Sequence, residues 1–217
     1  IAGLVGSGRS ETIRSVFGLN STTAGDVKME GRPDLKATYV TPDKALKTGF
    51  DLLSEDRKLE GLATGLSIST NITLSGLKKY VRGFLVNLSK ERESADKGRE
   101  DLAIKCRDVS DPVLSLSGGN QQKVALARLL HHDSDIFFLD EPTRGIDVGS
   151  KAEIYRLMQG LAAKGKAIIF VSSYLPELMG VCDTLAVMYR GEMSRVKPVS
   201  EWSEHDIMLF ATSGAEA

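Results

Sequence analysis

The sequence predicts an α/β fold, a mostly parallel sheet covered by helices, with a helical segment inserted into it. Two observations support this prediction. Short apolar runs alternate with amphipathic helical stretches, which is the pattern of parallel strands joined by helices. Between about residues 64 and 115 the apolar runs fade, and polar helical stretches such as 90–105 take their place. We therefore expect residues 64–115 to form a helical subdomain within the sheet domain.

The first element is the apolar stretch 1–5, which runs directly into a glycine-rich turn. We expect a buried parallel strand that enters a phosphate-binding loop. The chain begins without methionine, and nothing precedes this strand to lie on its other side. We interpret the chain as a piece of a longer protein from which the first strands are missing.

Three later apolar runs are predicted strands, namely 136–139, 168–171 and 185–188. Between the first two, apolar residues recur at helical spacing over 154–161, and Gly165 closes the segment. This periodicity predicts an amphipathic helix that packs against the sheet.

Composition and charge limit the classes of protein that fit. The 217 residues are 41% hydrophobic and 26% charged, which is a globular composition and excludes a disordered or collagen-like chain. The net charge of -1 gives no electrostatic argument for nucleic-acid binding. Two cysteines, Cys106 and Cys182, exclude a disulfide scaffold and fit a reducing compartment. No apolar run approaches the roughly 18 residues of a membrane span, and no signal peptide is present, so we expect a soluble domain of cytosolic type.

The first motif, GLVGSGRS at residues 3–10, fits the phosphate-loop pattern G-x-x-x-x-G-K-[S/T], except that arginine replaces lysine. Glycines in such a loop let backbone N–H groups point at phosphate oxygens, and the next helix adds its positive end. Ser10 would ligate Mg²⁺. Arginine is a broad planar fork and does not simply replace lysine. An ordinary glycine turn between a strand and a helix is the alternative. The candidate nucleotide-binding residues here are Gly3, Gly6, Ser7, Gly8, Arg9, Ser10 and Glu11.

The second motif, LSGGNQQK at residues 116–123, places a serine and two glycines before a helix expected from Lys123 to about His131. Hydroxyl and free N–H groups at a helix start form an anion-binding arrangement. An ordinary helix cap would explain Ser117 but not the rest of the motif. The candidate residues are Ser117, Gly118, Gly119 and Asn120.

A third motif ends the apolar run 136–139 with Asp140 and Glu141. A carboxylate at the C-terminal end of a buried strand lies where α/β sheets bind ligands, so Asp140 is a candidate Mg²⁺ ligand. Glu141 is a candidate catalytic residue that would orient or polarise a water. Two solvated acids are the alternative. In the turn 143–149 that follows, Asp147 is either a ligand contact or the N-terminal acid of the next helix.

In this order and spacing, the motifs resemble the ATP-binding cassette family over essentially the whole chain. The segments 6–11, 54–58, 116–123, 140–147 and 172–173 resemble more closely the second cassette of fused two-cassette importers for ribose-, galactose-, arabinose- and xylose-type sugars. The resemblance implies one nucleotide-binding domain over residues 1–217. In this family the missing first strands carry an aromatic residue that stacks on adenine.

The resemblance also reveals three departures around one phosphate. Arg9 stands in place of lysine, Glu55 in place of a glutamine that senses the γ-phosphate, and Ser173 in place of a histidine that contacts it. Together they imply a site that binds nucleotide but turns it over poorly. The charged stretch 54–58 is either a solvated loop or, as in the family, close to the contact with the membrane subunit.

Cassettes of this family pair head to tail, so the resemblance implies that Ser117, Gly118 and Gly119 complete the ATP site of a partner cassette. It implies ATP and Mg²⁺ as cofactors. The implied partners are the first cassette of the same polypeptide or a second copy, transmembrane permease subunits and, indirectly, a sugar-binding protein. The implied place is the cytoplasm, on the inner face of the cell membrane, with no nucleic-acid partner. Two alternatives remain: a soluble cassette protein that acts on nucleic acid, and a non-catalytic structural cassette.

Overall fold

The computed structural model describes residues 1–215, which divide into two compact units. The sheet unit comprises 1–52, 138–141 and the residues from 167 onward. The helical unit comprises 53–137 and 142–166. The predicted helical segment 64–115 lies inside the helical unit, which also includes two longer helices that follow it in sequence. The single-domain organisation predicted above stays a prediction.

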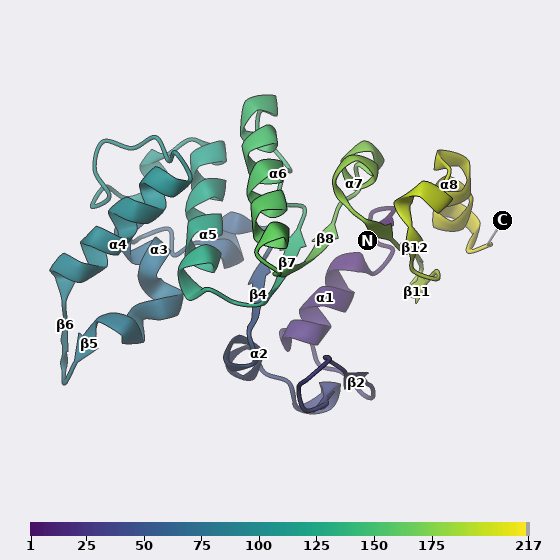
Figure 1. The fold of residues 1–217 in the computed structure, drawn as a ribbon, viewed down its shortest axis with the longest axis horizontal. Coiled ribbons are helices and arrows are strands. Elements are labelled where there is room, and N and C mark those ends of the chain that lie inside the picture. The colour runs from purple at the N-terminus through teal and green to yellow at the C-terminus, as the bar shows by residue number, and fades with distance from the viewer. Residues whose placement is uncertain (216–217) are drawn as a thin grey trace. The chain divides into compact units, whose positions relative to one another are not determined.

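Strands alternate with helices along the chain and pair into several small sheets (Figure 1). One three-stranded sheet has the order β1-β10-β11 and another the order β4-β7-β8, while the remaining strands pair in twos as β12-β9, β2-β3 and β5-β6. The bounds are β1 Ala2–Gly3, β2 Asp26–Val27, β3 Leu35–Lys36, β4 Phe50–Leu53, β5 Val81–Arg82, β6 Leu85–Val86, β7 Ile136–Asp140, β8 Ala167–Val171, β9 Thr184–Leu185, β10 Val187–Tyr189, β11 Glu192–Met193 and β12 Lys197–Pro198.

Helices lie in both units. The α-helices are α1 Arg9–Phe17, α2 Pro42–Thr48, α3 Ile68–Thr73, α4 Leu88–Asp101, α5 Gly118–His132, α6 Val148–Ala163, α7 Leu175–Val181 and α8 Glu204–Ser213. Short 3₁₀ turns cover η1 Ala37–Tyr39, η3 Leu74–Tyr80, η4 Val113–Ser115 and η5 Val199–Glu201, and η2 Arg57–Gly61 is a π-helical turn. Within the described residues, no helix combines the length and the apolar character needed to span a membrane.

Three sequence-based expectations need correction. The first strand is short, because the chain turns after β1 and leaves Leu4 and Val5 exposed; the N–H of Ser7 bonds back to the carbonyl of Leu4 at 3.1 Å. The run 185–188 is divided between β9 and β10, which belong to different sheets. Helix α5 starts at Gly118 instead of Lys123, because Ser117 caps it.

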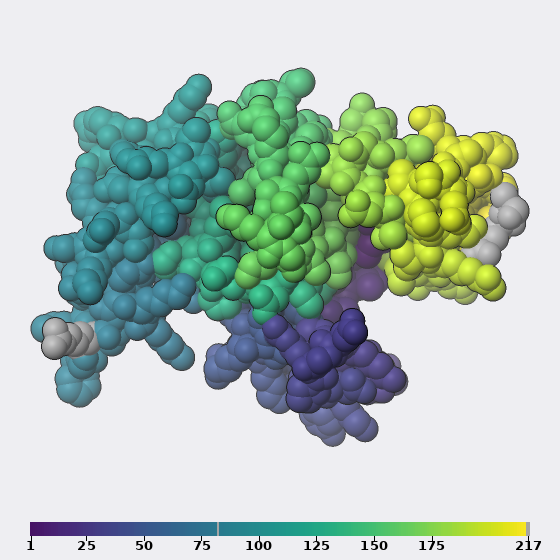
Figure 2. Space-filling view, viewed as in Figure 1, coloured from purple at the N-terminus to yellow at the C-terminus, as the bar shows by residue number. Residues whose placement is uncertain are grey.

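In the helical unit, α3 packs against α4 and α5 (Figure 1), and the space-filling view shows the blue-green residues 64–115 as one continuous mass (Figure 2). The helical unit has fully buried side chains at Ile68, Ile72, Ala95 and Val124. The segment also contains a feature that the sequence analysis did not predict, the hairpin β5–β6. Its two-residue turn begins at Gly83, whose φ of 64° suits glycine.

Asn71, fully buried on α3, ties this helix to the loop before it. Its Oδ1 accepts from the N–H of Ala63 at 2.8 Å, and its Nδ2 donates to the carbonyls of Ala63 at 3.0 Å and Ser67 at 2.9 Å. We expect Asn71→Ala to lower the free energy of unfolding by about 3 kcal/mol, since it leaves buried backbone groups unpaired. Urea denaturation measures this, with the exposed Ser115→Ala as the control. Equal stability of the two variants would contradict the prediction.

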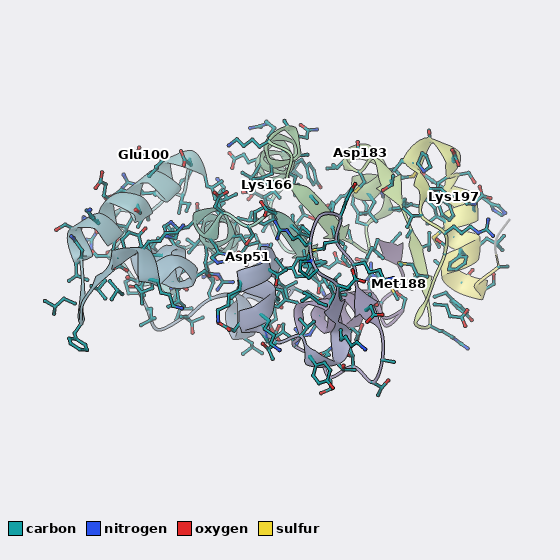
Figure 3. All side chains as sticks on the ribbon, turned by 60° about the horizontal axis from the view of Figure 1, so that its bottom comes forward. Asp51, Glu100, Lys166, Asp183, Met188 and Lys197 are labelled. Carbon is teal, nitrogen blue, oxygen red and sulfur yellow. The ribbon has the colours of Figure 1, made fainter. Side chains whose placement is uncertain are left out.

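In the sheet unit, β1 is held in place by pairing on both sides. It pairs in parallel with β10, where Gly3 lies opposite Met188, a residue labelled in Figure 3. On the other side, the carbonyl of Ile1 accepts from the N–H of Ser172 at 3.3 Å, just after β8. Helix α8 packs against both β1 and β10. These contacts fix the point at which the chain leaves β1 for the glycine-rich loop.

Candidate functional site

The glycine-rich loop between β1 and α1 adopts a conformation that requires glycine. Gly3, Gly6 and Gly8 have φ values of 151°, 79° and 102°. A Cβ atom on Gly3 would lie only 2.6 Å from the carbonyl oxygen of Met188 and 2.7 Å from Ser7 Oγ. Gly8 caps α1 without any side-chain hydrogen bond, so the first N–H groups of that helix have no capping side chain. This is the backbone arrangement expected of an anion-binding loop.

Buried polar atoms without partners lie in the same loop. Ser7 is 6% exposed and Arg9 is 7% exposed. Neither Ser7 Oγ nor Arg9 Nη1 has a hydrogen-bond partner among the described residues. Leaving such a group unpaired costs about 1–3 kcal/mol, and an anion in the loop would satisfy both. The residues present therefore fit a phosphate group.

Ser10 and Asp140, the two predicted metal ligands, are brought together. The Ser10 hydroxyl donates to Asp140 Oδ1 at 3.0 Å, and Asp140 is buried at the end of β7. Burial raises the pKa of Asp140, and the hydrogen bond from Ser10 opposes that shift. A hydroxyl and a carboxylate oxygen are hard ligands of the kind that Mg²⁺ prefers. Their separation fits a shared magnesium site next to the loop.

Glu141 and Arg9 form a buried ion pair that the sequence analysis did not anticipate. Arg9 Nη2 lies 3.5 Å from Glu141 Oε1, and the two side chains are 7% and 8% exposed. Burial lowers the pKa of Arg9, while the nearby Glu141 carboxylate raises it. In the sequence, only the opposite charges of the two residues and the position of Glu141 at the end of a strand hint at this pair.

The backbone around Glu141 holds its carboxylate in place. Glu141 has a φ of 45°, an uncommon left-handed conformation for a residue other than glycine. Its N–H donates to the carbonyl of Val171 at 2.9 Å, and its Oε1 accepts from the N–H of Ser173 at 2.7 Å. Ser173 thus reaches Glu141 through its backbone, while the side chain is exposed. Strained backbone of this kind clusters at functional sites.

In the helical unit, the second motif forms the start of α5. Ser117 Oγ accepts from the N–H of Asn120 at 3.5 Å and from its Nδ2 at 3.0 Å, while Asn120 Oδ1 accepts from the N–H of Lys105 at 2.8 Å. Ser117 is thus the predicted helix cap. Among the described residues the N–H groups of Gly118 and Gly119 have no hydrogen-bond partner, so they and the Ser117 hydroxyl can donate to an anion.

Gly118 and Gly119 lie close to side chains of neighbouring segments. A Cβ on Gly118 would lie 2.9 Å from Arg57 Nη2, and one on Gly119 would lie 3.1 Å from Ser150 Oγ and 3.4 Å from Asp147 Oδ2. Asp147 caps α6, accepting from the N–H of Ser150 at 3.0 Å and from its hydroxyl at 2.8 Å. These bonds lower the pKa of Asp147. Its predicted role as a helix-start acid is confirmed, and its carboxylate borders the α5 start.

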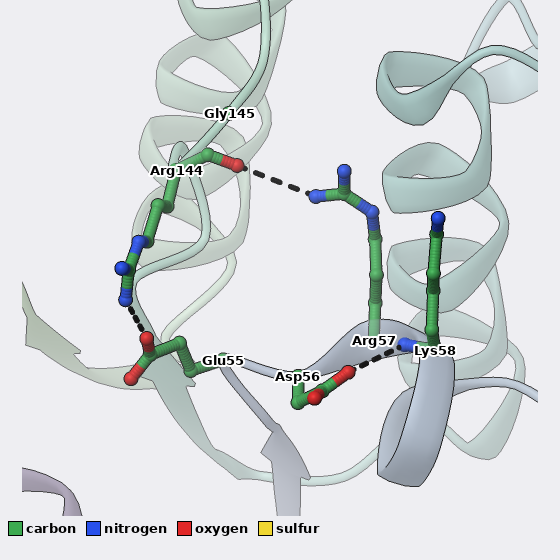
Figure 4. A pocket seen from close by; sticks show the side chains of 6 residues that line it. All are labelled: Glu55, Asp56, Arg57, Lys58, Arg144 and Gly145. Carbon is green, nitrogen blue, oxygen red and sulfur yellow. Dashed lines mark hydrogen bonds and ion pairs between the residues drawn. The ribbon is translucent and has the colours of Figure 1, made fainter.

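Glu55 lies in a pocket of the helical unit, and the Arg144 guanidinium neutralises its carboxylate (Figure 4). Glu55 belongs to the helical unit and the phosphate loop to the sheet unit, and the predicted contact of Glu55 with the γ-phosphate stays a prediction. Glu11 is exposed in the first turn of α1. The pocket holds about 280 Å³ and is lined by Glu55, Asp56, Arg57, Lys58, Arg144 and Gly145.

Residues 1–144 match a family model described as ABC transporter. The chain is 44% identical over its whole length to "Ribose import ATP-binding protein RbsA 2" of Streptomyces avermitilis and 46% identical over 99% of its length to "Ribose import ATP-binding protein RbsA 3" of Rubrobacter xylanophilus. It covers 42% of each of these proteins. The chain thus spans about two fifths of the length of these curated relatives.

Among solved structures, the fold resembles a dimeric post-hydrolysis state of the ATP-binding cassette MJ0796 bound to ADP and Pi, with a TM-score of 0.76 and 22% sequence identity. The match covers 93% of this chain and 84% of that one. At this identity the likeness concerns the fold alone, and it agrees with the α/β class predicted from the sequence.

Proposed function

Because this chain belongs to the ABC transporter family, we propose that it is the ATP-binding part of an importer for simple sugars. The relatives named as ribose import ATP-binding proteins support this substrate class and favour transport over the nucleic-acid alternative. We propose that residues 1–217 act as one nucleotide-binding domain with the helical subdomain 64–115.

In this proposal the loop of residues 3–10 binds the phosphates of ATP. Ser7 Oγ and Arg9 Nη1 are buried and have no hydrogen-bond partner among the described residues, so both can bind a phosphate. Ser10 and Asp140, 3.0 Å apart, would hold Mg²⁺. When bound, Mg²⁺ neutralises negative charge on the phosphates. The start of α1 adds its positive end.

The buried Arg9–Glu141 pair is the observation that supports a weak hydrolytic site. A general base must take a proton from water. The Glu141 carboxylate instead faces a guanidinium at 3.5 Å and accepts the Ser173 N–H at 2.7 Å. Both contacts engage the same carboxylate oxygen, Oε1, which leaves that oxygen less accessible to an attacking water. We therefore propose that this site binds MgATP and turns it over slowly.

The start of α5 differs from this site, since the Ser117 hydroxyl and the N–H groups of Gly118 and Gly119 can all donate to a phosphate. We propose that Ser117, Gly118 and Gly119 complete the ATP site of a partner cassette, either the first cassette of the same polypeptide or a second copy. The proposed assembly places this chain in the cytoplasm, against transmembrane permease subunits that receive sugar from a binding protein. ATP turnover in the paired site would then drive uptake.

Binding and turnover of MgATP by this chain test the proposal directly. We expect saturable binding, with a turnover rate that Glu141→Gln leaves unchanged, because Glu141 is already neutralised by Arg9. Binding is measured by isothermal titration calorimetry and turnover by phosphate release, after circular dichroism has confirmed that both proteins are folded. Brisk turnover that disappears in Glu141→Gln would refute the weak site and leave the family membership intact.

A further inference from the structure

Arg57 is the first residue of the π-helical turn η2, and its backbone is firmly held. Asp56 Oδ1 accepts from the N–H groups of Lys58 and Leu59, each at 3.0 Å. The Asp56 carbonyl accepts from the N–H groups of Glu60 at 2.9 Å and Gly61 at 3.1 Å. π-helical turns are rare in proteins, and those that occur lie frequently at functional sites. Asp56 is thus committed to the backbone of the turn.

The Arg57 guanidinium is directed at the start of α5. Its Nη1 donates to the carbonyl of Arg144 at 3.3 Å (Figure 4), and its Nη2 lies 2.9 Å from the place a Cβ on Gly118 would take. Any side chain at Gly118 would displace this guanidinium. The lack of a side chain at Gly118 therefore leaves room for the Arg57 guanidinium beside the first turn of α5.

The positive charge of Arg57 has no counter-ion in the part of the chain that the structure describes. Glu55 pairs with Arg144, and Asp56 is engaged by the turn. The Arg57 Nε is buried and has no hydrogen-bond partner among the described residues. Lys58 extends along Arg57 on the same side of the pocket (Figure 4) and, within the described residues, forms no ion pair through its ammonium group. The pocket is thus lined by three cationic side chains and only two carboxylates, and neither Arg57 nor Lys58 forms an ion pair within the described residues.

We propose that Arg57 is a phosphate-binding residue that acts with Ser117 and Gly118 on the γ-phosphate of the nucleotide held by the partner cassette. This inference rests on the proposed donation of the α5 start to that partner. A guanidinium binds phosphate through parallel N–H bonds, and Arg57 Nη2, the nitrogen beside Gly118, forms no hydrogen bond within the described residues. Lys58 adds positive charge to the same pocket.

The test uses the full-length importer ATPase with both cassettes, and compares ATP with ADP, which lacks the γ-phosphate. We expect Arg57→Gln to lower kcat/KM for ATP roughly 10- to 100-fold, the effect of losing one hydrogen bond to a charged group. The inhibition constant of ADP should stay within about 2-fold, since a contact to the γ-phosphate contributes nothing to ADP binding. Arg57→Lys, which keeps the charge, should recover part of the loss. Lys90→Gln, which removes an exposed cation of the same unit, should leave both constants unchanged.

Several results would overturn the proposal. Equal loss of ATP and ADP affinity in Arg57→Gln would mean that Arg57 only maintains the shape of the pocket. Unchanged kcat/KM of the detached ATPase, with transport lost in the presence of the permease, would mean that the pocket binds an acidic group of a membrane subunit. If Ser117→Arg also leaves turnover unchanged, the donation itself fails, and the failure belongs to the proposed function.

Discussion

Ser117→Arg is expected to reduce ATP turnover by the paired cassettes at least about 100-fold, the loss typical of removing a preorganised donor from a charged transition state. The Ser117 hydroxyl lies at the first turn of α5, beside Gly118 and Asn120. An arginine there removes the hydroxyl and its cap. Its long side chain also fills the space in front of the free N–H groups. Phosphate contact and helix start are lost together.

The experiment measures phosphate release by the full-length importer ATPase, with wild-type protein and Ser117→Thr as controls. Threonine keeps the hydroxyl and the ability to cap, so we expect most of the turnover to remain. The lost cap alone costs about 1 kcal/mol of stability, and a thermal melt will show that the arginine variant is still folded. Turnover near the wild-type rate in folded Ser117→Arg would exclude the donation of α5.

Much of the fold could be predicted because its signals are local. Gly3, Gly6 and Gly8 predict a loop with positive φ values, and all three have positive φ values in the structure. The apolar run before Asp140 predicts β7, and the structure confirms it with one more residue at its end. Helical periodicity and a cap at Asp147 likewise predict α6. In each case a few consecutive residues determine the conformation, so the sequence is informative.

The errors arise where tertiary contacts decide. The run 185–188 has the sequence pattern of one strand, but it is divided between two sheets. Leu185 belongs to β9, which pairs with β12, whereas residues 187–188 belong to β10, which pairs with β1 and β11. The hairpin β5–β6 has only four paired residues and lies in a segment whose other elements are all helices or 3₁₀ turns. Such short pairings leave no period in the sequence.

The candidate site shows the same division. Ser10 and Asp140 could be paired from the sequence because each follows from its own motif, and the structure places them 3.0 Å apart. The partner of Glu55 could not, because Arg144 is 89 positions away and belongs to a different motif. The close approach of the Arg57 guanidinium to Gly118 could not be predicted for the same reason. Motifs report what each segment binds in general, whereas ion pairs between motifs depend on the folded chain.

Arg9→Ala should have a large effect on stability and a smaller effect on turnover than Ser117→Arg. Arg9 is buried, and its removal leaves the Glu141 carboxylate buried with the Ser173 N–H as its remaining partner at 2.7 Å. Breaking a buried ion pair from one side costs about 3–5 kcal/mol. We therefore expect the free energy of unfolding, measured by urea denaturation, to fall by about 3 kcal/mol.

The double variant Arg9→Ala/Glu141→Gln separates the ion pair from packing. Because it removes both charges, it should be more stable than Arg9→Ala alone, recovering at least about half of the loss. Equal stability of the single and double variants would show that the arginine contributes only its packing. Turnover of the full-length importer ATPase provides the second comparison: if Arg9→Ala abolished turnover as completely as Ser117→Arg, both ATP sites would be needed for hydrolysis. The two substitutions therefore measure separately what this chain does for its own nucleotide and what it does for its partner's.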